Sequence, residues 1–251
     1  MQLDFWEQQL PFEYPFTISN GRTKTHQHSL MIRLSLGNWQ GYGEAPAIVY
    51  YNVTVKSMME LLEKNRKLIE KFALIDPERF WHFLHHLFPN DPFLVSALDM
   101  AGWDLFGQMN KKPLHEIWNT PWNVETPTPI CDYTLGIDSI EIMVEKMKAH
   151  PWPIYKIKVG TDYDIEMITA LRAHTSVPLR VDANAGWTTE EALQKIPALA
   201  ALGVELVEQP LAKDNWEGMA HLKASSVLPL FADESCVFEK DVATCAHYFH
   251  G

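Results

Sequence analysis

The chain has 251 residues, of which 47% are hydrophobic and 21% are charged, and its 21 Lys and Arg against 32 Asp and Glu give a formal net charge of −11. This composition is that of an ordinary globular protein, so it excludes a disordered, collagen-like or coiled-coil chain. The acidic balance, without a basic run, argues against nucleic acid or an anionic membrane as partner, because phosphate binding needs clustered positive charge. A small molecule is therefore the expected ligand.

The lack of a recognisable targeting signal and the pattern of cysteines favour a cytoplasmic location. The first residues carry neither a basic region nor an apolar core of a signal peptide, and no window approaches the roughly 18 apolar residues of a membrane span. Cys131, Cys236 and Cys245 are odd in number and lack C-x-x-C spacing. We expect them to be thiols in a reducing compartment rather than disulfides or zinc ligands.

The first quarter of the chain reads as strands. Leu30–Leu36 is apolar and partly alternating, Gly37-Asn38 is typical of a turn, and Trp39–Glu44 follows it. This pattern predicts a hairpin of two antiparallel strands.

Helical spacing begins near Val53 and continues until Asp76-Pro77, which starts a new segment. A further helix is predicted over Pro92–Met109, where apolar residues form a broad face. Residues 1–125 therefore read as an α+β domain, closed by a linker that is interrupted by prolines.

The second half, residues 126–251, has a different pattern of predicted elements. Short β-rich runs each precede a helical stretch such as Ile140–Ala149 or Thr189–Leu202. The runs are Ile130–Leu135, Ile154–Val159, Leu179–Val181, Val204–Val207 and Leu228–Phe231. Repeated β/α units require parallel strands with crossover helices. The fold class is therefore α/β, as a doubly wound sheet or a (β/α)₈ barrel.

Polar residues recur at the ends of these runs, roughly 25 residues apart, which is one position per β/α unit. They are Thr134, Lys156, Lys158, Asp182, Asn184, Glu208 and Asp233. In a barrel the carboxyl ends of the strands meet at one mouth. Three carboxylates gathered there would repel one another unless a divalent cation joined them, and an all-oxygen donor set suits Mg²⁺. Asp182, Glu208 and Asp233 are the candidate ligands.

Lys156 and Lys158 are two residues apart on one strand, so both point to the same face, toward that metal. A cation and a second lysine nearby disfavour the ammonium form and would lower the lysine pKa. We expect Lys158 to be a general base and Lys156 its electrostatic partner, in proton abstraction α to a carboxylate. Taken alone, K-I-K is usually a solvated strand edge and an Asp after a strand is usually a helix cap; the regular spacing favours the functional interpretation.

Four runs resemble the enolase superfamily, and specifically its muconate-lactonising subgroup. They are Lys156–Gly160, Val181–Asn184, Val207–Pro210 and Ala232–Ser235, and Gly41–Pro46 and Ala97–Leu105 resemble capping-domain segments of the same family. The resemblance implies an enolase-type (β/α) barrel, of which about five strands are present, preceded by an α+β capping domain. It also implies that Asp182, Glu208 and Asp233 bind Mg²⁺ and that Lys158 is one of two acid/base lysines.

Within this subgroup the chain most resembles the dipeptide epimerases, of which the L-Ala-D/L-Glu type is the best known. Thr128–Thr134 resembles their first barrel strand, which implies that Thr134 contacts substrate, as Lys156 and Asn184 would. Arg22–Thr25 resembles their mobile loop, and Arg22 is the candidate for binding a distal carboxylate. The expected activity is that of an isomerase, the Mg²⁺-dependent epimerisation of a dipeptide from cell-wall peptide turnover through an enolate intermediate.

The sequence departs from the family at its end, since Gly251 comes before the position of a sixth barrel strand. In the family the sixth strand carries the second catalytic lysine, and the eighth strand carries the acidic pair that holds the ammonium group of a dipeptide. Three alternatives therefore stay open: o-succinylbenzoate synthase, muconate cycloisomerase, or a catalytically incomplete barrel fragment with a binding or assembly role. A homo-oligomer is expected from the resemblance alone. His82, His85 and His86 have helical spacing, but we interpret them as packing or surface residues of the capping domain rather than as a zinc site.

Overall fold

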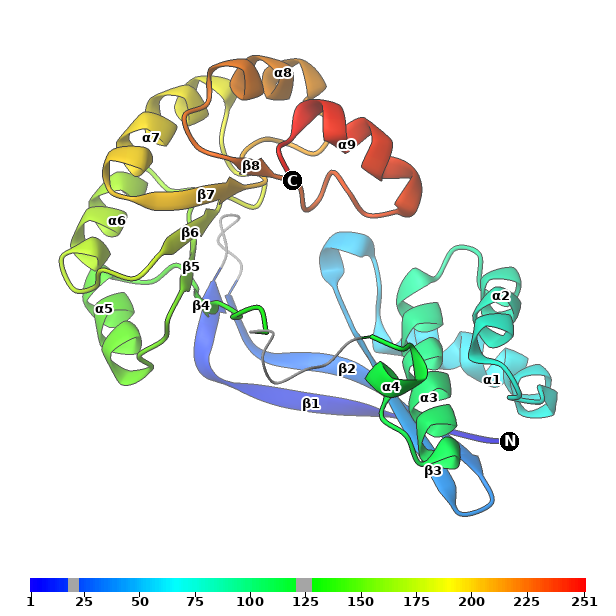
Figure 1. Ribbon diagram of the computed structural model, residues 1–251. Coiled ribbons are helices and arrows are strands. Elements are labelled where there is room, and N and C mark those ends of the chain that lie inside the picture. Colours follow the sequence, from blue (N-terminus) through cyan, green and yellow to red (C-terminus); the bar gives the residue numbers. More distant parts are fainter. Residues whose placement is uncertain (18–22, 121–127) are drawn as a thin grey trace. The chain divides into compact units, whose positions relative to one another are not determined.

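The computed structural model describes residues 1–17, 23–120 and 128–251. The chain forms two compact units, which are described separately below (Figure 1). The first contains Met1–Glu13 and Thr25–Pro127, and the second contains Tyr14–Lys24 and Thr128–Gly251. Among the described residues, no helix has both the length and the apolar character that crossing a bilayer requires.

Most of a three-stranded sheet lies in the first unit, in the order β1 (Gln2–Thr17), β2 (Thr23–Leu36) and β3 (Trp39–Pro46); residues 14–17 of β1 and 23–24 of β2 belong to the second unit. The predicted hairpin is confirmed, because β2 and β3 are antiparallel and Leu36 pairs with Trp39 across the turn. Gly37 occupies this turn with a φ of 59°, a conformation that glycine adopts without steric cost. Sequence analysis did not predict β1, since the prolines in its second half do not favour a strand.

Helices cover this sheet. They are η1 (Val49–Tyr51), α1 (Val55–Lys71), α2 (Pro77–Leu87), α3 (Pro92–Asn110) and α4 (Leu114–Ile117). The start of α1 is fixed by a capping box between Thr54 and Ser57, and the start of α2 by the Asp76 carboxylate, which accepts a hydrogen bond from the backbone N–H of Glu78. Leu30, Ile32 and Leu34 alternate along β2 and are fully buried in the core of this unit.

Two glycines of β3 allow α3 to lie directly on the strand. A Cβ atom added at Gly43 would stand 1.9 Å from the carbonyl oxygen of Ala97, and one added at Gly41 would stand 2.2 Å from that of Ala101. Both neighbours are backbone atoms of a helix and cannot move aside cheaply. The Gly41-x-Gly43 pair is therefore a packing feature of this unit.

The second unit contains a parallel sheet with the sequential order β4 (Tyr133–Leu135), β5 (Tyr155–Lys158), β6 (Leu179–Asp182), β7 (Val204–Glu208) and β8 (Leu230–Phe231). The helices that follow the strands are α5 (Ile140–Ala149), α6 (Asp164–Arg172), α7 (Thr189–Ala201), α8 (Trp216–Ser225) and, after η2 (Glu239–Asp241), α9 (Val242–Tyr248). The helices α5 to α8 line one side of the sheet (Figure 1). This sequential winding is that of a barrel, because a doubly wound sheet reverses its strand order.

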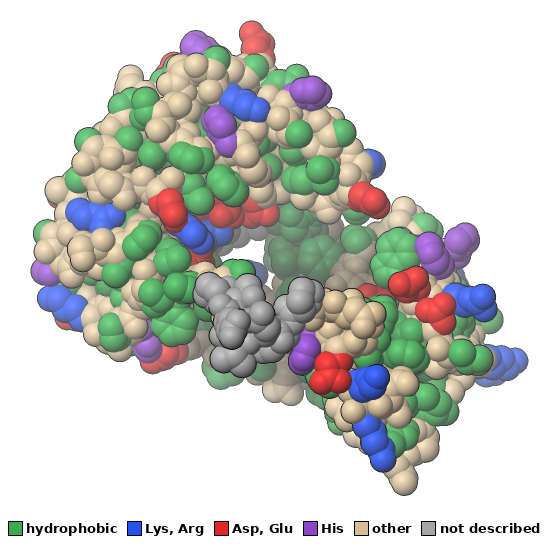
Figure 2. Space-filling model, in the orientation of Figure 1, with side chains coloured by type: hydrophobic (Ala, Val, Ile, Leu, Met, Phe, Trp, Pro, Cys, Tyr) green, Lys and Arg blue, Asp and Glu red, His purple; other side chains and the backbone are tan. Residues whose placement is uncertain are grey.

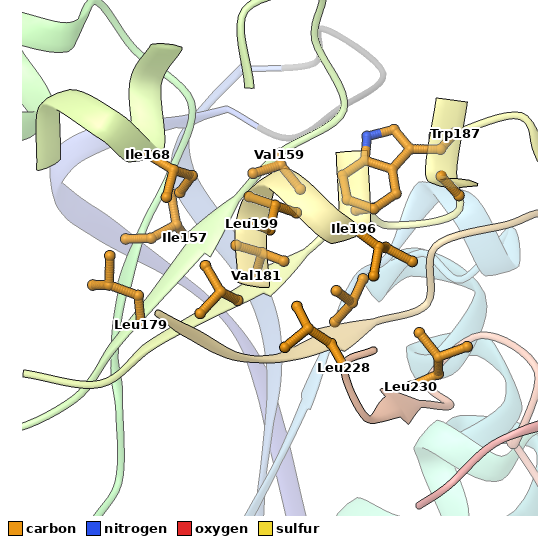
Figure 3. Packing of buried hydrophobic residues seen from close by; sticks show 14 of the residues in the cluster. Ile157, Val159, Ile168, Leu179, Val181, Trp187, Ile196, Leu199, Leu228 and Leu230 are labelled. Carbon is orange, nitrogen blue, oxygen red and sulfur yellow. The ribbon is translucent and has the colours of Figure 1, made fainter. Parts of the chain in front are cut away.

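The core of the second unit lies between the sheet and its helices. Ile157 and Val181 point from adjacent strands toward Ile168 of α6 and Leu199 of α7, and all four are fully buried (Figure 3). Because side chains alternate along a strand, the residues between these apolar positions point to the opposite face. The same packing that holds the helices therefore aims Lys156, Lys158 and Asp182 away from them.

We expect Gly43→Ala to lower the free energy of unfolding by about 3 kcal/mol or more, because the added methyl group meets a backbone carbonyl that the helix holds in place. Gln40→Ala is the matched control, since the Gln40 side chain is exposed on the same strand, and it should change the free energy by less than about 0.5 kcal/mol. Urea denaturation measures both variants. Equal stability of the two would contradict the direct packing of α3 on β3.

Candidate active site

Charged side chains meet at the carboxyl ends of the central strands. In the sheet register Lys158 pairs with Asp182, and Asp182 pairs with Glu208, so these three residues form one row across β5, β6 and β7. Neighbouring strands are about 4.8 Å apart, so side chains in one row and on one face are in contact. Figure 2 shows acidic and basic side chains adjoining on the side of this unit away from the helices.

A group of three carboxylates lies in this row and beside it. One carboxylate oxygen each from Asp182, Glu208 and Asp233 lies within 4.8 Å of the others. Asp182 is fully buried, Glu208 is half-buried and Asp233 is exposed. Three hard anionic oxygens at this spacing fit Mg²⁺ by charge and donor type, and leave further positions of an octahedron to water or a substrate.

Two lysines share the same carboxylates. Lys156 Nζ lies 2.6 Å from Glu208 Oε1 and 2.9 Å from Asp182 Oδ2, while Lys158 Nζ lies 2.6 Å from the same Asp182 oxygen. Both ammonium groups are largely buried, with side chains 19% and 12% exposed for Lys156 and Lys158. Their charges offset part of the repulsion within the carboxylate group.

Burial alone would lower the pKa of Lys156, but the Asp182 and Glu208 carboxylates outweigh it and raise that pKa. The lowered pKa that sequence analysis expects of the base, beside a bound cation, stays a prediction, since the nearest charges to Lys156 here are carboxylates. Burial would raise the pKa of Asp182, yet the ammonium groups of Lys158 and Lys156 hold it below its usual range. Burial and the neighbouring Asp182 carboxylate raise the pKa of Glu208.

The structure places the other candidate residues around this centre. Thr134 of β4 pairs with Lys156 of β5, one row before the carboxylates. Asn184 has a φ of 46°; its backbone N–H donates to Asp182 Oδ1 at 2.9 Å, and its Nδ2 donates to Glu234 Oε1 at 3.3 Å. Arg22 lies outside the described residues.

No other group of three possible metal ligands occurs within residues 1–17, 23–120 and 128–251. His82, His85 and His86 therefore form no such group. His85 Nδ1 and His86 Nδ1 instead lie 3.1 and 2.8 Å from the carbonyl oxygens of Trp81 and His82, one turn earlier on α2.

Sequence analysis missed Asp164, which is fully buried behind the site. Its carboxylate accepts hydrogen bonds from the backbone N–H groups of Gly160 and Thr161 at 3.0 and 2.8 Å, from Trp187 Nε1 at 2.9 Å, and from Lys195 Nζ at 2.8 Å. It thus joins the loop after Lys158 to the loop after Asp182 and to α7. A lone Asp at a helix start usually indicates a cap, so its spacing gave no sign of this burial.

Comparison with known proteins places these features in context. Residues 139–247 match the family model described as enolase C-terminal domain-like. The chain is 46% identical over 251 residues to an L-Ala-D/L-amino acid epimerase of Flavobacterium johnsoniae, with 100% of this chain and 74% of that protein covered.

Two solved structures are similar over nearly the whole chain. A substrate-liganded complex of the L-Ala-D/L-Glu epimerase from Bacillus subtilis gives a TM-score of 0.87 at 28% identity and covers 98% of this chain and 70% of that chain. A dipeptide epimerase from Enterococcus faecalis, complexed with Mg and the dipeptide L-Leu-L-Tyr, gives a TM-score of 0.87 at 28% identity and covers 97% and 70%. The chain shares their fold.

We expect Asp164→Asn to lower the free energy of unfolding by about 3 kcal/mol, because it leaves the Lys195 ammonium without its buried partner and turns an NH₂ group toward hydrogen-bond donors. Asp162→Asn makes the same chemical change at an exposed position two residues away and should be close to neutral. Thermal denaturation compares the two variants. A neutral Asp164→Asn would rule out the bracing role of this carboxylate.

Proposed function

Because the chain belongs to the dipeptide epimerases of the enolase superfamily, we propose that it epimerises a dipeptide of the L-Ala-D/L-Glu type by removing and returning an α-proton. The observation that carries the proposal is the single row in which Lys158 lies beside Asp182, and Asp182 beside Glu208. A relative at 46% identity is an epimerase, so we favour epimerisation over the synthase and cycloisomerase alternatives.

The chemical difficulty is the weak acidity of a proton α to a carboxylate, whose removal leaves negative charge on the carboxylate oxygens. Asp182, Glu208 and Asp233 would hold Mg²⁺ through their carboxylate oxygens. When bound there, Mg²⁺ supplies positive charge that stabilises the enolate. This assignment agrees with the donor set and with the burial of Asp182.

Lys158 is the proposed base. It must be neutral to accept a proton, so its ammonium group must give up the contact with Asp182 Oδ2 before it acts. Lys156 is proposed to keep its proton, because its Nζ lies 2.6 Å from Glu208 Oε1 and 2.9 Å from Asp182 Oδ2. It therefore contributes a fixed positive charge beside the reacting carboxylate, while Lys158 moves the proton on one face of the α-carbon. Inversion also needs an acid that returns a proton to the opposite face, a role that the family resemblance gives to a second lysine on the sixth barrel strand.

Substrate contacts are proposed for the side chains that surround this pair. Thr134 lies beside Lys156 in the sheet, and Asn184 follows Asp182 in a left-handed turn. Arg22 is proposed to bind the distal carboxylate of a glutamyl residue. In the same scheme residues 1–125 form the capping domain and residues 126–251 belong to the barrel.

We expect the protein to exchange the α-proton of the Glu residue in L-Ala-L-Glu for deuterium in D₂O when Mg²⁺ is present. Lys158→Ala should slow this exchange at least about 100-fold, since it removes the base. Proton NMR follows the loss of the α-proton signal. Lys148→Ala, an exposed lysine on α5, should retain full exchange. Exchange that survives in Lys158→Ala would exclude Lys158 as the base, and no exchange by the unaltered protein would favour a binding or assembly role.

Asp233→Asn should weaken Mg²⁺ binding by about tenfold or more, because an amide oxygen carries no charge and is a poorer ligand for a hard cation. Isothermal titration with MgCl₂ measures the affinity directly. The control is Asp214→Asn, an exposed carboxylate on the preceding loop, which should bind Mg²⁺ as the unaltered protein does. Equal affinities in the two variants would remove Asp233 from the ligand set.

A further inference from the structure

The three carboxylates of the candidate metal site are held in different ways. Asp182 ends β6 and Glu208 ends β7, and both residues pair with neighbours in the parallel sheet. Asp233 lies two residues beyond β8, in a bend rather than in a strand, and it is exposed. Its position therefore depends on contacts other than strand pairing.

Gln209 supplies those contacts from a fully buried position. Its Oε1 accepts hydrogen bonds from the backbone N–H of Asp233 at 3.0 Å and from that of Ser235 at 3.1 Å. Its Nε2 donates to Ser235 Oγ and to the carbonyl oxygen of Leu211, both at 2.9 Å. One side chain thus joins the loop after β7 to the turn that carries Asp233.

The partners require an amide at this position. Two backbone N–H groups must face an oxygen, and the Leu211 carbonyl must face a donor, so the orientation of the amide is fixed by its surroundings. In Gln209→Glu a second oxygen would face the Leu211 carbonyl, and a buried charge would be added beside three carboxylates. Ser235 extends the arrangement, since its hydroxyl donates to the carbonyl oxygen of Lys213 at 2.9 Å.

The backbone of Gln209 also helps to hold the turn that carries Asp233. Its φ of 36° lies in the left-handed region, which a residue with a Cβ adopts rarely. Its own N–H donates to the carbonyl oxygen of Phe231, the last residue of β8, at 2.8 Å, which continues the pairing of β7 with β8 one residue past the end of β7. The residue after one carboxylate of the site thus holds the strand and the turn that lead to another.

We infer that Gln209 is a positioning residue that fixes Asp233 within the metal site. Of two consecutive residues, Glu208 would then be a metal ligand itself, and Gln209 would hold a second ligand, Asp233, in place through its side chain. This inference rests on the metal site of the proposed function. It concerns the affinity for Mg²⁺ and needs no statement about the substrate.

The test is isothermal titration of the protein with MgCl₂, without substrate, together with melting temperatures. Gln209→Met keeps the length of the side chain but removes all four hydrogen bonds, and it should weaken Mg²⁺ binding by about 10- to 100-fold. Ser235→Ala keeps both bonds to Oε1 and should weaken binding by about threefold. If Gln209→Met does not fold, the Ser235→Ala titration decides the question.

Arg172→Met is the matched control. The Arg172 guanidinium donates to the carbonyl oxygens of Thr175, Val177, Leu202 and Gly203, at the amino-terminal edge of the same sheet. Its loss should lower the melting temperature as Gln209→Met does, while the Mg²⁺ affinity stays within about twofold of the unaltered protein. This comparison separates a loss of stability from a loss of ligand position.

Unchanged Mg²⁺ affinity in folded Gln209→Met, or in Ser235→Ala when the former does not fold, would overturn the inference. Equal weakening in Gln209→Met and Arg172→Met would overturn it as well, because the effect would then follow stability alone. A protein that binds Mg²⁺ but exchanges no α-proton would contradict the proposed function and leave this inference standing. A protein that binds no Mg²⁺ would contradict both.

Discussion

Carboxylates gathered within 4.8 Å repel one another, and much of the second unit is arranged around that repulsion. Lys156 and Lys158 bring two positive charges to three negative ones, and both contact the one buried member, Asp182. One negative charge remains in excess, on the side where Asp233 is exposed. The lysine ammonium groups thus offset most of the negative charge of the carboxylates, and a divalent cation would compete with them for the same carboxylate oxygens.

The energy that opposes this repulsion comes from the other face of the sheet. Ile157, Val181 and Val207 are fully buried against the helices, and each such side chain contributes about 1.5–3 kcal/mol relative to an exposed one. Asp164 adds a fixed connection between the loops that follow Lys158 and Asp182. A face of the sheet that carries mutually repelling carboxylates is therefore supported by a well-packed apolar face, and alternation along each strand keeps the two sets of side chains apart.

Sequence patterns predicted the features that depend on local periodicity. The β2–β3 hairpin and the β/α order agree with the structure, and α5 has the predicted limits, because alternation and helical spacing are properties of short segments. The clustering of Lys158, Asp182 and Glu208 was predictable from regular spacing. The burial of Asp164 and Gln209 was not, since it arises from loops more than 20 residues away. The raised pKa of Lys156 was not predictable for the same reason, as it depends on carboxylates of two other strands.

The row that joins Lys158, Asp182 and Glu208 also ties chemistry to strand alignment. Because side chains alternate, a slip of β6 by one residue would turn Asp182 toward the helices and Val181 toward the charged face. A molecule with such an error would keep nearly all of its backbone hydrogen bonds, yet it would have lost the central carboxylate. With Asp182 as the proposed metal ligand, metal affinity would therefore report correct folding in this protein. Molecules that have paired their strands out of alignment would then be recognised, and removed, by their failure to bind the cation.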